Sequence, residues 1–470
     1  MNTCPRIYRY RKENSRPETS FRDVLFFRGK TVDGQTGLLA EGTESDAVNI
    51  EPVRAAEGDV LRWKDPGIRC AVFYYEARTD ERWVQTYSYE SESNWTMYDR
   101  ERSGGPLTGP ETVFSGTVYI RLAIHIPEGK DLPEDLRTLF ELVPGENRRK
   151  ETEEQAPYFV KETQRIRKKL DAVRKPEDTI LFLLADTHYT VNGGWEETER
   201  NLKAAAAACA PDAIVHLGDL TDGLLPKEQT LQYAGRVLQG MRNAAEPVFC
   251  CLGNHDSNYF RNNPERMSAK EAARQYLGRE REYYFADLPE KRLRMIFLAS
   301  FDGRKKEPGK KYGFSLRERV WLRRILNGTP QTYRVVIFSH VPLLPEMHVW
   351  SRDIRGSKEL LALLEAFQAE RHALLAFVHG HNHADQTEKD HAFPIVSIGC
   401  SKLESFPEKK PVGAVCYKRE RSTVTQELWD VLRIRADGTG LDLFRFGAGR
   451  DRHLQTGLSA EKERQGEGAL

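Results

Sequence analysis

Polar side chains follow five separate apolar runs from residue 180 onward. The runs are residues 180–185, 213–217, 248–252, 335–338 and 374–378, and their composition is typical of buried strands. Directly after them come Asp186 and His188, Asp219 and Asp222, Asn254 to Asp256, His340, and His381 with His383. An open α/β sheet gathers the loops at the carboxyl ends of its strands into one crevice. We therefore expect these five loops to build one site.

The chemistry of these side chains indicates a metal site. Carboxylates, an amide oxygen and imidazoles all bind divalent first-row metals, and there is no thiolate among them. The potential ligands are too many for one ion but suit two ions that share a carboxylate. Residues two apart in an extended segment point the same way, so Asp186 and His188 are expected to reach a common site, as are His381 and His383.

The five blocks resemble the motifs of the calcineurin-like metallophosphoesterase superfamily. That pattern is Asp-x-His, Gly-Asp-x-x-Asp, Gly-Asn-His-Asp or Glu, a separate His, and Gly-His-x-His. All five elements occur here in this order, over roughly residues 178–403. One block alone is weak evidence, but five in order are specific. The resemblance implies an α/β (α+β) fold in which a metallophosphoesterase-type β-sandwich core is flanked by helices.

Carried over position by position, the resemblance implies a role for each ligand. One metal is held by Asp186, His188 and His383, Asp219 bridges to a second metal, and Asn254, His340 and His381 complete the second site. His255 is then free of metal and is expected beside the substrate as a general acid. The implied reaction is hydrolysis of a phosphate mono- or diester by a hydroxide that bridges the two ions.

The identity of the two divalent ions is left open. Purple acid phosphatases, in the same superfamily, place a Tyr ligand where this chain has Asp222. Without a tyrosinate, which favours ferric iron, a pair of Mn, Fe(II) or Zn ions is expected. The sequence does not choose among these metals.

Several residues near the blocks allow two interpretations. Asp222 or Asp256 is expected to orient a histidine from behind the metal ligands. Tyr189 and Trp195 either contact the leaving group of the substrate or cover the helix that follows them. Of the remaining histidines, we expect His216 and His379 in the core or behind the ligands, and His348 and His391 at the surface.

The length of 470 residues predicts at least two domains. Short runs of Val, Ile and aromatic residues between turn signals indicate a β-sandwich near the amino terminus. Within it, residues 53–60 and 116–122 resemble β-sandwich modules attached to bacterial and phage envelope enzymes. We expect a disordered N-terminus (1–20), an all-β, jelly-roll-like domain (21–143), a charged helical connector (144–177), the phosphoesterase domain (178–451) and a disordered tail (452–470). Within the phosphoesterase domain, helical patterns are expected at about residues 196–209, 228–243, 268–277, 316–326 and 358–369.

Composition argues against several classes of protein. Lys plus Arg number 71 against 70 Asp plus Glu, so no basic excess indicates a nucleic-acid partner. The first residues lack the apolar run of a signal peptide, and no run reaches membrane-spanning length. Seven scattered Cys fit a reduced compartment. We therefore expect a cytoplasmic protein without a membrane span.

The sequence leaves the substrate open. A phosphorylated small molecule or an envelope-type phosphoester is expected, and the oligomeric state is not determined. One alternative is a catalytically weak binding or scaffold protein that uses the β domain for recognition, and another is a nuclease. The intact ligand set counts against the first, and the absence of an evident basic and aromatic track counts against the second.

Overall fold

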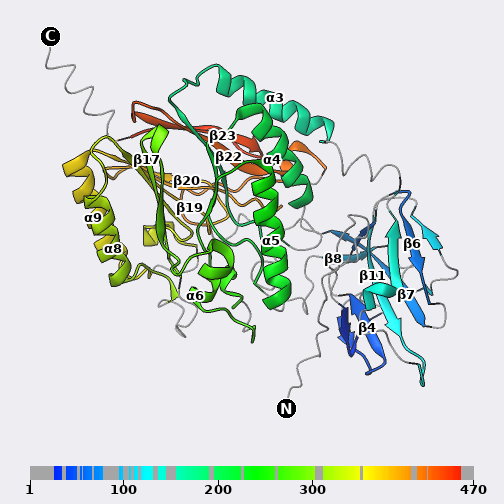
Figure 1. Ribbon diagram of the computed structural model, residues 1–470. Coiled ribbons are helices and arrows are strands. Elements are labelled where there is room, and N and C mark those ends of the chain that lie inside the picture. Colours follow the sequence, from blue (N-terminus) through cyan, green and yellow to red (C-terminus); the bar gives the residue numbers. More distant parts are fainter. Residues whose placement is uncertain are drawn as a thin grey trace, which may run out of the picture. The chain divides into compact units, whose positions relative to one another are not determined.

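The structure is a computed structural model that divides into two compact units, residues 1–156 and 157–470 (Figure 1). The residues that it describes are 26–33, 39–49, 53–55, 57–65, 68–77, 95–98, 105–106, 111–114, 118–130, 136–143, 145, 155–189, 195–223, 227–259, 263–301, 311–349, 353–403, 410–420 and 422–456. In this part of the chain all cysteines are free thiols. None of the helices described there combines the length and the apolar composition needed to cross a bilayer.

The first unit is all β, as expected. One sheet has the order β1-β4-β11-β7-β8, and a second has the order β10-β6-β12. Their bounds are β1 Phe26–Arg28, β4 Asp46–Asn49, β11 Val118–His125, β7 Arg69–Ala77, β8 Trp95–Tyr98, β10 Glu111–Val113, β6 Val60–Trp63 and β12 Phe140–Val143. The described pairs within both sheets are antiparallel. Phe26 of the first sheet stacks on Phe140 of the second at 5.7 Å, so the two sheets face each other across an apolar core.

The shorter strands of the first unit complete its edges. β5 (Val53–Ala55) pairs with β11, and β9 (Gly105–Pro106) pairs with β7. A separate hairpin is formed by β2 (Lys30–Val32) and β3 (Leu39–Glu41). A 3-10 turn, η1 (Leu136–Leu139), leads into β12. These additions keep the unit entirely β apart from that turn in its described part.

The second unit contains two six-stranded mixed sheets. Their orders are β15-β14-β13-β22-β23-β24 and β16-β17-β18-β19-β21-β20. The first sheet consists of β13 Thr179–Leu184, β14 Ala213–His216, β15 Val248–Cys250, β22 Leu428–Ile434, β23 Gly440–Gly447 and β24 Arg452–Gln455. The second consists of β16 Tyr284–Leu288, β17 Leu293–Leu298, β18 Arg334–Ser339, β19 Leu374–His379, β20 Gln386–Glu388 and β21 Ile395–Ser397.

Both sheets contribute to one shared apolar core. Leu183 and Leu432 from the first sheet belong to the same buried cluster as Phe297 and Phe338 from the second. Helices α3, α4 and α5 lie on one side of the sheets and α8 and α9 on the other (Figure 1). Their bounds are α3 Pro157–Asp171, α4 Trp195–Cys209, α5 Lys227–Ala244, α8 Leu316–Asn327 and α9 Ser357–Arg371. The expected β-sandwich core flanked by helices is therefore confirmed.

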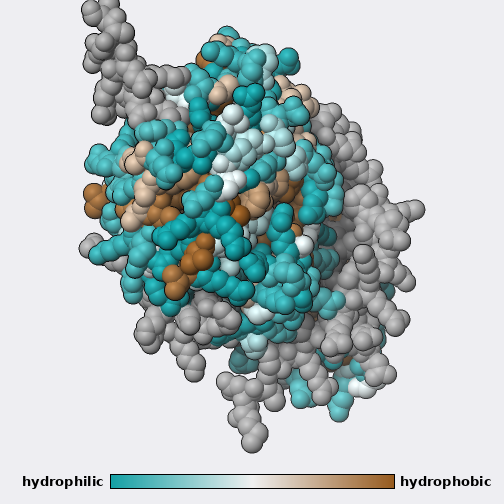
Figure 2. All heavy atoms as spheres, turned by 60° about the vertical axis from the view of Figure 1, so that its left-hand side comes forward, coloured by the Kyte–Doolittle hydropathy of each residue, from teal (hydrophilic) through white to brown (hydrophobic). Residues whose placement is uncertain are grey.

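The helix α8 shows how the local sequence fixes an element. The Ser315 hydroxyl accepts a hydrogen bond from Glu318 N, and the Glu318 carboxylate accepts one from Ser315 N, which is a capping box. Leu322 on this helix is buried, whereas Leu316 is 69% exposed. The outward side of the α8 and α9 layer is mainly hydrophilic, with only small hydrophobic spots (Figure 2). An amphipathic helix predicted from its periodicity thus packs by one stripe.

Two of the predicted boundaries are wrong. The charged connector was expected to run to residue 177, but α3 belongs to the second unit and packs on α4 and β23. Phe159 of α3 stacks on Phe446 at 6.0 Å, which fixes the helix by apolar contact. The tail was expected from residue 452, but β24 continues the sheet there. Residues 1–20 and 457–470, expected to be disordered, lie outside the described part.

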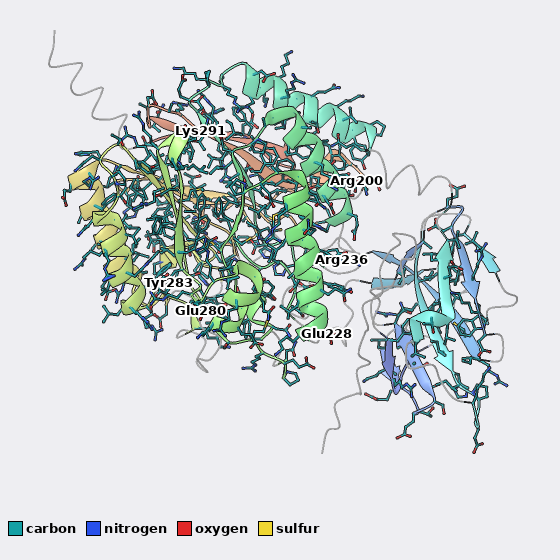
Figure 3. All side chains as sticks on the ribbon, viewed as in Figure 1. Arg200, Glu228, Arg236, Glu280, Tyr283 and Lys291 are labelled. Atoms are coloured by element: carbon teal, nitrogen blue, oxygen red, sulfur yellow. The ribbon has the colours of Figure 1, made fainter. Side chains whose placement is uncertain are left out.

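The two sheets are also joined by charged side chains at their ends. Lys291, before β17, donates to the carbonyl oxygens of Pro176 and Asp178 at 3.0 and 2.7 Å (Figure 3). Arg445 on β23 is 1% exposed and bonds Asp430 at 2.8 Å and Asp385 at 2.7 Å. Because Asp385 comes two residues after His383, this ion network fixes the last of the five loops to the first sheet.

Replacing Arg445 tests this network. Arg445→Met leaves Asp385 and Asp430 buried with less compensating charge, and we expect a loss of about 3–5 kcal/mol in the free energy of unfolding. Urea denaturation followed by circular dichroism measures it. Arg450→Met, at an exposed position of the same segment, is the matched control. Equal stability of the two variants would contradict the assigned role.

Candidate metal centre

The five loops come together at the carboxyl ends of buried strands. All five expected strands are present, as β13, β14, β15, β18 and β19. β13, β14 and β15 are parallel neighbours in one sheet, and β18 and β19 are parallel neighbours in the other. The ends of these strands therefore meet along one edge of the sandwich, and each is followed by one of the polar blocks.

The first group of side chains is formed by Asp186, His188 and His383. One possible ligand atom from each lies within 4.8 Å of the others, and all three side chains are buried. Nε2 of His383 lies 3.4 Å from Asp186 Oδ1 and 3.2 Å from His188 Nε2. Two ring nitrogens at this distance, beside a carboxylate oxygen, converge on one point, as the ligands of a shared cation do.

The second group is formed by Asp219, His340 and His381, with Asn254 beside it. Nε2 of His340 lies 3.2 Å from Asp219 Oδ2, 3.1 Å from Asn254 Oδ1 and 3.0 Å from His381 Nδ1. The loops that carry Asp219, Asn254 and His381 thus bring oxygen and nitrogen atoms close to Nε2 of His340.

Asp219 joins the two groups. Its Oδ2 lies 3.7 Å from His188 Nε2 in the first group and 4.0 Å from His255 Nε2. His188, Asp219 and His255 also form a third set of converging atoms. The structure therefore brings together all seven predicted metal ligands and His255, with Asp219 in the middle.

The backbone at this site is strained. Five of the ten non-glycine residues with positive φ in the described part are predicted ligands: Asp186 (52°), His188 (43°), Asp219 (58°), His381 (68°) and His383 (50°). Non-glycine residues pay roughly 1–2 kcal/mol each for this left-handed conformation. We predicted that the paired ligands converge because their segments are extended, and that reason is wrong. Left-handed turns direct them instead, and such strain clusters at functional sites.

The charges of the site favour a cation among these donors. Burial lowers the pKa of His340, but Asp219 and Asp186 outweigh burial and raise it to about 9. Burial raises the pKa of Asp219, yet the surrounding imidazoles lower it well below its usual value. The buried carboxylates thus favour a positive charge on His340. A divalent ion would supply that charge directly, so the donor set fits the metal centre that the resemblance implies.

Asp222 and Asp256 differ in what they contact. Asp222 Oδ1 lies 3.1 Å from His188 Nδ1, the position of a residue that orients a histidine. Asp256 accepts hydrogen bonds from the backbone N–H groups of Asp219, Leu220 and Gly253 at 2.8–2.9 Å instead. Asp222 is therefore the candidate whose carboxylate lies beside a histidine. The Asp256 carboxylate instead holds the backbone of the loop that carries Asp219.

Tyr189 and Trp195 are both buried in the helical layer. The Tyr189 hydroxyl donates to Glu196 at 2.5 Å, and its ring packs on Tyr233 at 5.3 Å. Trp195 is the first residue of α4 and is 3% exposed. This packing favours the interpretation that Tyr189 and Trp195 cover the helix that follows them, over the interpretation that they contact the substrate.

His216 and His379 are fully buried, as expected. Nε2 of His216 lies 2.8 Å from the hydroxyl of Thr187, between the first two ligands in the chain. His379 Nδ1 lies 3.0 Å from Gly380 O. Both residues therefore support ligand loops rather than joining the groups described above.

The prediction that His348 lies at the surface is wrong. His348 is 5% exposed, and its ring lies 4.8 Å from the ring of His381 and 4.7 Å from that of Tyr312. The side chain of Asn382 donates to Met347 O and so fixes the turn before His348 over the site. No regular periodicity marks this turn. The only signal in the sequence is the apolar segment 341–347 that follows His340.

Tyr259 was also not identified from the sequence. Its hydroxyl is hydrogen-bonded to the side chains of Asn254 and Tyr312, and the ring of Tyr312 lies 5.4 Å from that of His381. These tyrosines contact two predicted ligands from the outside, where they fix the ligand side chains.

Comparison with known proteins agrees with the geometry. Residues 181–385 match the family model of the calcineurin-like phosphoesterases. The range begins in β13 and includes all seven predicted ligands. Residues 181–385 therefore form a calcineurin-like phosphoesterase domain. No curated protein sequence matches the chain.

The solved structures that are similar to part of this chain are distant from it in sequence. A dimetal phosphatase from Danio rerio is 17% identical over 59% of this chain and 98% of its own, with a TM-score of 0.42. A putative 5'-nucleotidase from Staphylococcus aureus is 13% identical over 59% of this chain and 54% of its own, with a TM-score of 0.33. The phosphopantetheinyl hydrolase from Mycobacterium tuberculosis is 12% identical over 51% and 97%, with a TM-score of 0.32.

Gly253 provides a test of this geometry. A Cβ at Gly253 would lie 2.1 Å from Asp219 Oδ1, so Gly253→Ala is expected to displace the central carboxylate. We expect this variant to retain little metal in elemental analysis after loading with manganese. In the control, Gly235→Ala, the new Cβ meets nothing within 4 Å inside α5, and it should bind metal like the wild type. Full metal binding by Gly253→Ala would contradict the central place of Asp219.

Proposed function

We propose that this protein is a metal-dependent phosphoesterase that hydrolyses a phosphate mono- or diester with two divalent ions. The observation that carries the proposal is the meeting of two donor groups at Asp219. One ion would be held by Asp186, His188 and His383. The other would be held by Asn254, His340 and His381, and Asp219 would bind both ions. The absence of a sulfur ligand in these groups suits Mn, Fe(II) or Zn. When bound, such a pair lowers the pKa of a water and neutralises charge on the phosphoryl oxygens.

In this proposal His255 moves a proton to the leaving oxygen. Its Nδ1 is hydrogen-bonded to Asp222 O, which fixes the ring, and its Nε2 faces Asp219. Burial lowers the pKa of His255 to about 4, although Asp219 opposes this. The ring alone is therefore neutral at pH 7. An anionic phosphoryl group beside it would favour the protonated form.

Two lysines add positive charge around the loops. Lys402 Nζ lies 3.5 Å from Asp222 Oδ1, and Lys410 Nζ donates to Asn382 O at 2.8 Å. Lys402 thus contacts a residue beside His188, and Lys410 contacts the residue between His381 and His383. Positive charge at this edge would raise the local concentration of anionic substrates such as phosphorylated small molecules or envelope-type phosphoesters.

The shared carboxylate can be tested by metal content. Asp219→Asn weakens both proposed ion sites at once, so we expect loss of nearly all bound manganese and of nearly all hydrolysis of aryl phosphates. Elemental analysis and a p-nitrophenol release assay measure the two effects. A variant that keeps both ions and its turnover would overturn the proposal. A wild-type protein that binds metal but hydrolyses neither monoesters nor diesters would instead be a binding protein.

The role of His255 can be tested by varying the leaving group. Alkoxides need a proton to depart, whereas p-nitrophenolate does not. We therefore expect His255→Ala to lower kcat by roughly 10²- to 10⁴-fold for alkyl phosphates and much less for p-nitrophenyl phosphate. Metal content should stay at the wild-type level. His391→Ala, which alters a histidine paired with Glu365 on the surface, is the control. Equal losses for both substrates would remove His255 from the acid role.

A further inference from the structure

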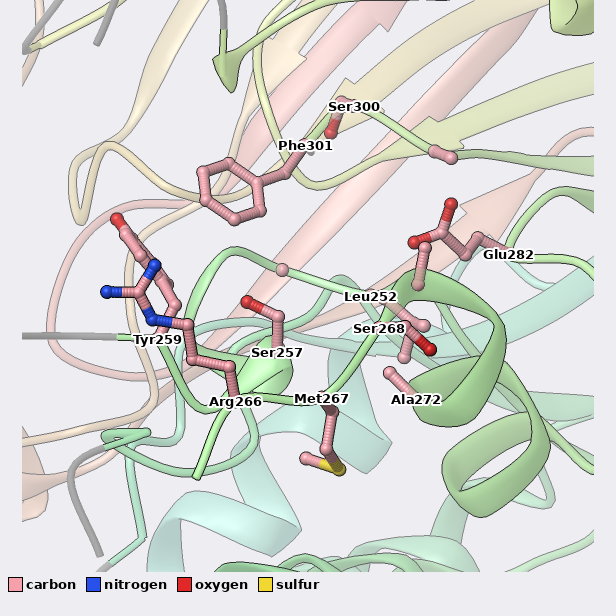
Figure 4. Close-up of a pocket in the computed structure, with 13 residues that line it drawn as sticks. Leu252, Ser257, Tyr259, Arg266, Met267, Ser268, Ala272, Glu282, Ser300 and Phe301 are labelled. Carbon is pink, nitrogen blue, oxygen red and sulfur yellow. The ribbon is translucent and has the colours of Figure 1, made fainter. Parts of the chain in front are cut away.

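A cavity of about 310 Å³ opens beside the metal centre, a volume at the lower end of the range for small-molecule sites. It is lined by the loop after β15, by the start of α6 (Ala269–Ala272) and by the loop after β17 (Figure 4). Leu252, Met267, Ala272 and Phe301 make much of its wall apolar. The mechanism proposed above uses none of these four side chains.

Residues of the cavity wall are bonded directly to the predicted ligand Asn254 or form hydrogen bonds with it. Gly253, on its wall, directly precedes Asn254, and the Ser257 hydroxyl donates to Asn254 O at 2.9 Å. Tyr259, also on the wall, is hydrogen-bonded to the Asn254 side chain, and its ring lies 6.4 Å from that of His255. A group in this cavity would therefore lie on the side of the centre where His255 delivers its proton.

One cation lines the cavity, and a second contacts Tyr259 on its wall. Arg266 is on its wall, and its guanidinium lies near Tyr259 in Figure 4. Lys311 Nζ lies 4.9 Å from the centre of the Tyr259 ring. Partial burial and the charge of Arg266 both lower the pKa of Lys311. Glu282, the acidic residue of the wall, lies on the opposite side in that view.

We propose that this cavity binds the leaving group of the substrate and that the leaving group carries a second anionic group, a phosphate or a carboxylate, held by Arg266 and Lys311. This inference rests on the proposed function, because it takes the metal centre as the site of the scissile phosphate. An anion between the two cations would relieve their repulsion, and an Arg guanidinium can bind such a group in a bidentate way. The apolar wall and the Tyr259–Phe301 pair, 4.8 Å apart, would contact the carbon body.

Binding of non-hydrolysable ligands tests the proposal without relying on turnover. Calorimetry on manganese-loaded full-length protein would compare three series with carbon spacers of matched length: alkylphosphonates, phosphonoalkanoates with a terminal carboxylate, and alkane bisphosphonates. We expect at least one spacer length at which a charged terminus improves the Kd roughly tenfold over the methyl terminus, the scale of one hydrogen bond to a charged group. The carboxylate and phosphonate series distinguish the two kinds of anion.

The variants identify the residues responsible. Arg266→Gln combined with Lys311→Gln should abolish the advantage of the charged terminus and leave the affinity for alkylphosphonates unchanged. Arg317→Gln, at an exposed position of α8, should keep the advantage. Thermal unfolding and manganese content would confirm that each variant is folded and loaded.

The outcomes separate this inference from the proposed function. If the wild type hydrolyses aryl phosphates but binds charged and methyl-terminated ligands equally at every spacer length, the second anion site is overturned and the hydrolase stands. The same holds if the advantage survives in the double variant. If the advantage exists and depends on Arg266 and Lys311 while no ester is hydrolysed, the anion site stands and the hydrolase fails.

Discussion

The attraction between two buried carboxylates and the imidazoles around them is the interaction on which the second unit depends. Asp186 and Asp219 lie at the ends of neighbouring strands, and without positive charge nearby their burial would be costly. In this structure the two carboxylates raise the pKa of His340 and so favour that charge on its ring. A metal pair would replace it with a stronger one, because the donor atoms already converge. The same attraction offsets the strain of the left-handed turns that direct the ligands inward.

The surrounding structure keeps these strained loops from relaxing. Asp256 fixes the loop of Asp219 through the backbone N–H groups of Asp219 and Leu220, and Gly253 leaves room for the Asp219 carboxylate. Arg445 fixes the last loop through Asp385, across from one sheet to the other. None of Asp256, Gly253 and Arg445 is itself a predicted ligand. Rigid support of this kind holds a site in its working geometry.

Much of the fold followed from local patterns. The five apolar runs became five strands, and the periodicity at residues 316–326 became α8, because burial and capping act over a few neighbouring residues. The errors came where distant contacts decide. Phe446 draws α3 into the second unit, and Asn382 draws the turn before His348 over the site. Neither contact produces a regular spacing of apolar residues that could be recognised in the sequence.

The sequence by itself determined which side chains would meet at the strand ends, since five blocks of metal-binding residue types follow five apolar runs in a specific order. Tertiary structure alone decided how these side chains converge and what surrounds them. The left-handed turns, the hydrogen bond from Tyr259 to Asn254 and the cations beside the cavity all arise from segments far apart in the chain. Residue type sets which atoms a side chain offers, but only packing of the whole domain sets their distances.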